Sequence, residues 1–162
     1  MTAVAEAPTM TGRFLVRPAL FDWLVDRVST DDAVVGDRAL AARIVDQALA
    51  FLAASGTSPH TLVPSRLVDV GWHAFLLHTR EYAAYCDQIA GRFIHHTPAG
   101  TADEPVDAAS ARDRTLTAIT EAGYAVDADL WPEMVSADCS DEGNCSASGK
   151  DGNENKDTRI PN

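Results

Sequence analysis

The chain has 162 residues, which suits one domain and leaves little room for a second. Hydrophobic residues make up 46% and charged residues 23%, a mixture typical of globular rather than disordered proteins. The 13 basic and 24 acidic residues give a formal net charge of −11. This charge argues against a nucleic acid or an anionic membrane as the main partner, because both attract clustered Lys and Arg.

The sequence also bears on location and on the redox environment. The N-terminus has no basic region followed by an apolar core, and no apolar run approaches the roughly 20 residues that span a bilayer. We therefore expect a cytoplasmic protein. The three cysteines are an odd number and do not suggest a disulfide framework.

Composition divides the chain into three parts. Both lysines and all four asparagines lie at or after position 144, and Ile160 is the only large aliphatic residue after Val135. Such a segment cannot bury enough apolar surface to offset the entropy lost on ordering. We therefore predict a flexible arm over residues 1–12, a helical domain over 13–136 and a disordered polar tail over 137–162.

Apolar spacing within the domain predicts helices in chain order. The first begins near Pro18, a residue suited to a first helical turn, and carries Leu20, Trp23, Leu24 and Val28 on its apolar side. The others are expected over 37–54, from 65 to about 78, over 79–90 and over 109–122. Expected N-caps are Asp31 or Asp32, Ser65 and Thr79, and expected terminating residues are Gly56 with Pro59, Gly91 and Gly123. The predicted fold is all-α, a compact bundle of about five helices with short irregular or extended segments.

The residues that can carry chemistry concentrate between positions 68 and 96. Asp69 and His73 are four residues apart and share one face of a helix. Trp72 shares an apolar stripe of the same helix with Val68, Phe75 and Leu76 and is expected to be buried. His73 and His78 are five apart, which separates them by about 140° on a straight helix. They converge only if the chain breaks near Thr79. Imidazole, thiolate and carboxylate are the usual zinc ligands, so this segment is a candidate metal site.

The same segment resembles a known family. The residues Asp69, Trp72, His73, His78, Tyr82 and Cys86 are similar in type and spacing to the signature of the glycine-rich-domain-containing-protein-like family. The run GRFIHH at 91–96 and the pair Trp131-Pro132 resemble further features of its bacterial members, and the glycine-rich region of larger relatives is absent. Two positions depart from the pattern, with Phe75 in place of a histidine and Thr79 in place of a proline. The resemblance implies a fold and a candidate site but no reaction.

Three functional hypotheses remain open at this point. The leading one is a metal-stabilised accessory or protein-interaction module, with zinc held by some of Asp69, His73, His78, Cys86 and His96. The second is an enzyme that uses the same cluster for metal-assisted or cysteine-dependent chemistry on a small molecule. The third is a metal-free packing module. In the tail, the spacing of Cys139 and Cys145 permits either a disulfide loop or capture of a soft metal.

Overall fold

The computed structural model describes residues 9–97, 107–133 and the pair 146–147. In this part of the chain nearly all regular structure is helical, which confirms the expected all-α fold with five α-helices. The α-helices are α1 (Pro18–Val28), α2 (Arg38–Thr57), α3 (Arg66–Leu76), α4 (Thr79–Ala90) and α5 (Ala108–Glu121). Two short 3-10 helices span Gly12–Leu15 and Ala128–Leu130.

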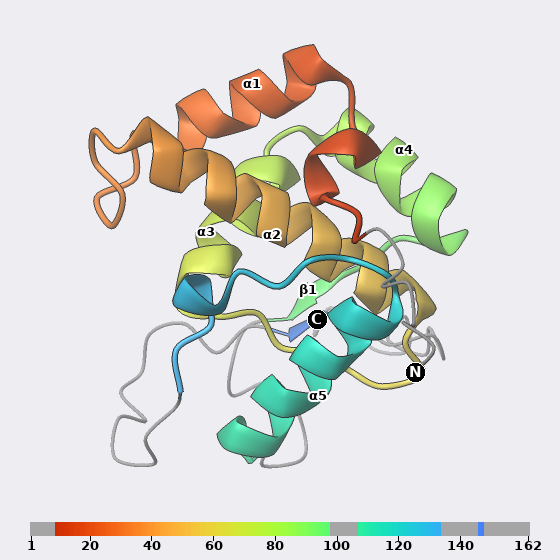
Figure 1. The fold of residues 1–162 in the computed structure, drawn as a ribbon. Coiled ribbons are helices and arrows are strands. Elements are labelled where there is room, and N and C mark those ends of the chain that lie inside the picture. Colours follow the sequence, from red (N-terminus) through yellow and green to blue (C-terminus); the bar gives the residue numbers. More distant parts are fainter. Residues whose placement is uncertain (1–8, 98–106, 134–145, 148–162) are drawn as a thin grey trace, which may run out of the picture.

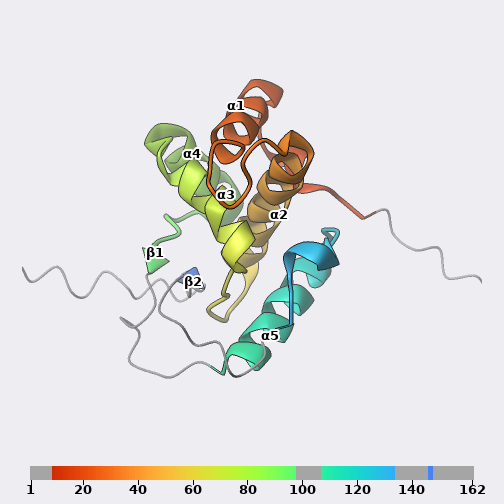
Figure 2. The same cartoon turned by 90° about the vertical axis from the view of Figure 1, so that its left-hand side faces the viewer.

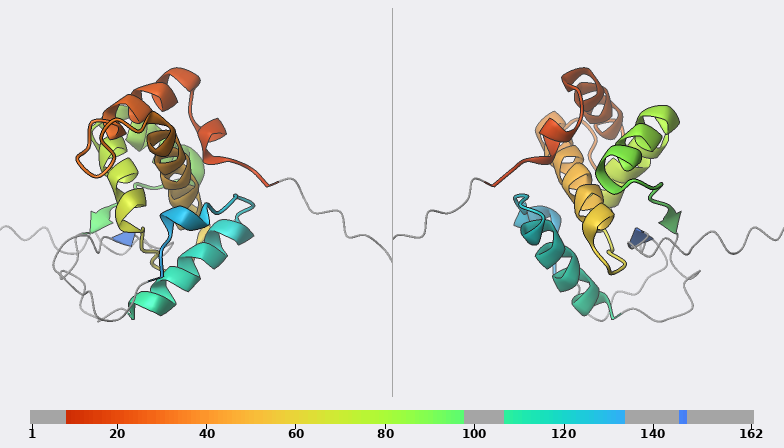
Figure 3. Two further views of the ribbon diagram at one scale, coloured as in Figure 1. Left: turned by 60° about the vertical axis from the view of Figure 1, so that its left-hand side comes forward. Right: turned by 90° about the vertical axis from the view of Figure 1, so that its right-hand side faces the viewer.

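The centre of the molecule is α2 (Figure 1). The other four α-helices all pack against it, with α1, α3 and α4 grouped on one side and α5 lying across its C-terminal part (Figures 2 and 3). Every residue from Gln47 to Gly56 is buried. Five of these ten residues are Ala or Gly, and such small side chains let the neighbouring helices approach closely. The core is therefore built around one nearly enclosed helix.

The enclosure of α2 also explains its composition. By length and hydropathy the helix could cross a membrane, although the sequence led us to expect no such segment. Yet 72% of its most apolar 18-residue stretch is buried inside the fold. A helix that is apolar on most sides is required at the centre of a bundle, because neighbours contact it from several directions.

Several of the expected helix boundaries are confirmed, among them those at Pro18, Ser65, Gly91 and Gly123. The Ser65 side chain accepts a hydrogen bond from the Val68 amide at 3.2 Å and caps α3. Gly91 ends α4 in a left-handed conformation with φ of 65°, which glycine adopts without steric cost. Trp72 is fully buried, as its place on the apolar stripe of α3 predicted.

Other expected boundaries are wrong. The N-cap of α2 is Asp37, whose carboxylate accepts from the Leu40 amide at 2.9 Å, whereas Asp31 stabilises the preceding turn by accepting from the Ala33 amide. Helix α2 also continues through Gly56 to Thr57, because Gly56 is buried against the end of α4. Thr79 is the first residue of α4 rather than its cap, a position that His78 occupies without a side-chain cap hydrogen bond.

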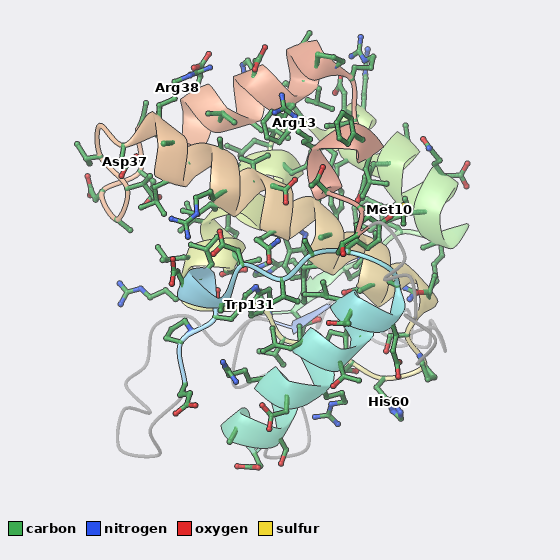
Figure 4. All side chains as sticks on the ribbon, viewed as in Figure 1. Met10, Arg13, Asp37, Arg38, His60 and Trp131 are labelled. Carbon is green, nitrogen blue, oxygen red and sulfur yellow. The ribbon has the colours of Figure 1, made fainter. Side chains whose placement is uncertain are left out.

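The segment after α5 is bound to α2 by polar contacts. Gln47 is buried; its amide nitrogen donates to the Ala125 carbonyl, and its amide oxygen accepts from the Asp127 amide and from the Trp131 indole. One turn earlier, Arg43 pairs with Asp127 at 2.6 Å, and this pairing lowers the pKa of that carboxyl. Trp131 is thereby fixed in the core (Figure 4). These contacts give the Trp131-Pro132 segment a structural role.

The predicted division into arm, domain and tail lies partly outside the described residues. Residues 1–8, 134–145 and 148–162 are not among them, so the expected disorder of 137–162 stays a prediction. The exception is Ser146–Ala147, the strand β2, which pairs antiparallel with β1 (His96–Thr97) as seen in Figure 2. In this register His96 lies opposite Ala147.

Helix α3 approaches α2 closely at Gly71. A Cβ atom placed on Gly71 would lie 2.9 Å from the Ala48 Cβ and 3.1 Å from the Ile44 Cγ2. Both distances are shorter than ordinary contacts between carbon atoms. Glycine at this position therefore sets the spacing between the two helices.

Replacing Gly71 with Ala should destabilise the protein by about 1–3 kcal/mol, the usual cost of overpacking a core. In an open helix the same change stabilises by roughly 0.5–1 kcal/mol because alanine loses less conformational entropy. Urea denaturation of the two proteins measures the difference. A Gly71→Ala variant more stable than the natural protein would contradict the close packing described here.

Candidate metal centre

Helix α3 presents Asp69 and His73 on the face turned away from α2. Each is two residues from Gly71, a rotation of about 160° from the contact with α2, and they are about 40° from each other. The His73 Nδ1 atom lies 3.4 Å from Asp69 Oδ2. The Asp69 side chain is only 6% exposed, whereas that of His73 is 55% exposed. Asp69 therefore forms the floor of the site and His73 its solvent side.

The third member, His96, reaches the site from β1. Its Nε2 atom lies 2.9 Å from Asp69 Oδ1, and its side chain is only 11% exposed. The imidazole packs beside the His73 ring at 4.4 Å and beside the indole of Trp72 at 4.3 Å, both measured between ring centroids. His96 thus covers the carboxylate of Asp69.

The three side chains have the geometry of an approximate metal site. One ligand atom from each of Asp69, His73 and His96 lies within 4.8 Å of the other two. Zinc–nitrogen and zinc–oxygen bonds of about 2.0–2.2 Å in a tetrahedron place neighbouring ligand atoms about 3.3–3.6 Å apart. Asp69 Oδ1 lies 2.9 Å from His96 Nε2, and Asp69 Oδ2 lies 3.4 Å from His73 Nδ1, so each imidazole is close to this spacing from a different oxygen of the carboxylate.

The other predicted ligands lie elsewhere. Among the described residues, His78 and Cys86 are not part of the Asp69, His73 and His96 group. His78 lies at the break between α3 and α4, where its Nδ1 atom is 3.5 Å from a Glu81 carboxylate oxygen. Its ring meets the edge of Trp23, which is 39% exposed. The chain does break near Thr79, but this break directs His78 toward α1 and α4.

Cys86 is fully buried on the inner face of α4. Burial raises the pKa of its thiol, although the neighbouring backbone of Ile94 and hydroxyl of Tyr82 act in the opposite direction. A catalytic thiol needs exposure and a lowered pKa, since the thiolate is the nucleophile. The environment of Cys86 therefore suits a packing residue rather than a nucleophile.

A layer of buried polar contacts lies behind the cluster. The Trp72 indole donates to the Tyr82 hydroxyl at 2.9 Å, and that hydroxyl donates to the Ile94 carbonyl at 2.6 Å. Part of this layer can be predicted from the sequence, because Tyr82 and Cys86 are four residues apart on α4. Ile94 cannot be predicted in this way, because its contribution comes from its backbone.

Cys86 should resist alkylation in the folded protein. In a Cys139→Ser, Cys145→Ser variant it is the sole thiol, and iodoacetamide should modify it at least about tenfold more slowly in the native than in the unfolded state, because its sulfur is buried and its pKa is raised. Mass spectrometry follows the modification. If iodoacetamide labels the native protein at neutral pH as fast as the unfolded chain, the hypothesis of a cysteine-dependent enzyme would be supported.

Comparison with known proteins identifies the family. A profile described as UCP032817-like matches residues 22–121, a range that contains all three residues of the cluster. The resemblance to the glycine-rich-domain-containing-protein-like family, inferred from the spacing of residues 69–96, is therefore wrong. Searches of curated proteins and of solved structures gave no significant match. Because the matching profile covers more than half of the sequence, the chain belongs to the uncharacterised UCP032817-like family.

Proposed function

We propose that this protein is a helical metal-binding module that holds one divalent transition-metal ion through Asp69, His73 and His96. The observation that carries the proposal is the convergence of two imidazoles and one carboxylate, from α3 and β1, within 4.8 Å of one another. The nearly complete burial of Asp69 adds support, because a buried carboxylate needs a cation or hydrogen-bond donors beside it.

The ligand set favours zinc. Two histidines and a carboxylate are ligands of known zinc sites, which often keep a fourth position for water. The same three groups on one side of an ion also suit Fe²⁺. Zinc and iron are therefore the two ions that an experiment must compare.

We propose first that the bound ion stabilises an accessory or protein-interaction module. We expect this module to act in the cytoplasm. A metal-assisted enzyme is the second candidate, and one observation favours it. His73 is 55% exposed, so the ion would be open to solvent and could carry a water at its free position. If no ion binds, the protein is a metal-free packing module, because the hydrogen bond from His96 can by itself provide the donor that the buried Asp69 carboxylate needs.

Metal binding should depend on His73 and not on His78. Both histidines lie near the surface at the C-terminal end of α3, so their replacement by Ala should disturb the fold little. The natural protein, purified without a His tag, stripped with chelator and reloaded, should bind about one zinc ion. At a free zinc concentration a hundredfold above the dissociation constant, this binding should stabilise the fold by about 2.7 kcal/mol.

Elemental analysis and thermal melting with and without Zn²⁺ or Fe²⁺ provide the readouts. His78→Ala should retain the ion and the shift in melting temperature, whereas His73→Ala and Asp69→Asn should lose both. Failure of the natural protein to bind either ion, or equal loss in His73→Ala and His78→Ala, would overturn the proposal.

A further inference from the structure

The two halves of the cluster come from parts of the chain that are far apart in the sequence. Asp69 and His73 lie on α3, but His96 comes from a segment that follows α4, more than twenty residues later. The placement of His96 therefore depends on what holds the chain just before β1. The residue held there is Ile94, which is fully buried and lies two positions before His96.

Two side chains of α4 hold the backbone of Ile94. The Tyr82 hydroxyl donates to its carbonyl at 2.6 Å, and the buried thiol of Cys86, one turn further along α4, lies beside its backbone. The aromatic ring of Phe93 packs on the edge of Tyr82 at 5.2 Å between centroids. The segment leading into β1 is thus fixed against the inner face of α4.

Tyr82 also contacts α3 directly. Its hydroxyl oxygen accepts a hydrogen bond from the indole of Trp72, the residue that precedes His73 and packs on the His96 ring. Tyr82 is fully buried, and burial raises the pKa of its hydroxyl well above the usual value. The hydroxyl therefore stays protonated and keeps its role as the donor to Ile94.

We infer that Tyr82 is a positioning residue of the metal centre, which sets His96 against Asp69 and His73 through its hydrogen bonds to Ile94 and Trp72. The inference rests on the proposed function. Residues that orient metal ligands from outside the ligand set affect metal affinity by about 10- to 100-fold when they are replaced.

The chain provides a matched control in Tyr85. It is another buried tyrosine of α4, and its hydroxyl likewise donates to a backbone carbonyl, that of Leu49 at 2.7 Å. This carbonyl belongs to α2, which carries none of the cluster's three residues. Tyr82→Phe and Tyr85→Phe therefore remove the same group from the same helix, but only the first removes a contact to the segment before His96.

The experiment measures Zn²⁺ affinity by competition with a chromophoric chelator, together with the thermal midpoint of each metal-free protein. Tyr82→Phe should bind Zn²⁺ about tenfold or more weakly than the natural protein, beyond any change that Tyr85→Phe shows. The absorption spectrum of bound Co²⁺ should change in Tyr82→Phe and stay unchanged in Tyr85→Phe, since it reports the ligand geometry.

A second measurement does not need the ion. In the metal-free protein, NMR contacts between the His96 and Trp72 rings should weaken in Tyr82→Phe and persist in Tyr85→Phe. Equal effects of the two variants on affinity and on these contacts, or no effect of either, would overturn the positioning role. If the natural protein binds no metal while Tyr82→Phe alone moves His96, the proposed function fails and the positioning of His96 by Tyr82 stands.

Discussion

The close contact between α2 and α3 at Gly71 is the constraint on which the rest of this structure depends. Helix α2 is enclosed on most sides, and the missing side chain of Gly71 lets α3 approach to the distance of a carbon–carbon contact. The contact also fixes the rotation of α3 about its axis. Asp69 and His73, two residues to either side, must then face away from α2 and toward the chain that leads into β1. The candidate metal centre therefore follows from a packing requirement in the core.

Burial divides the polar residues of the segment 69–96 into two groups with different roles. Asp69, His73 and His96 form the group that reaches solvent, because the exposed His73 ring lies beside the buried carboxylate of Asp69, and two imidazoles and a carboxylate could bind an ion there. Trp72, Tyr82 and Cys86 are fully buried, and the Tyr82 hydroxyl bonds to the Trp72 indole and to the backbone of Ile94. The first group has the chemistry of a site, and the second gives that site a fixed geometry. Residues that look equally reactive in the sequence are thereby separated by their exposure.

The strand pair beside the cluster adds a feature that composition argued against. Ser146–Ala147 lies in a segment too polar to form a core of its own, yet it pairs with the strand that carries His96. Such a pairing needs no apolar side chains, because its hydrogen bonds join backbone groups. A strand of only two residues gains little from them, so the packing of His96 on Trp72 and Asp69 contributes more to the order of β1.

The sequence by itself determined the helices and part of the site. Apolar spacing predicted all five helices, and Ser65 and Gly91 marked two of their ends, because capping and periodicity are local properties of the chain. The spacing of Asp69 and His73 placed two members of the cluster on one face for the same reason. Only the tertiary structure decided which distant residues join them. His96 belongs to the cluster and His78 does not, because the chain after α4 returns past Tyr82, whose hydroxyl bonds to the Ile94 carbonyl, a backbone group that no sequence pattern identifies.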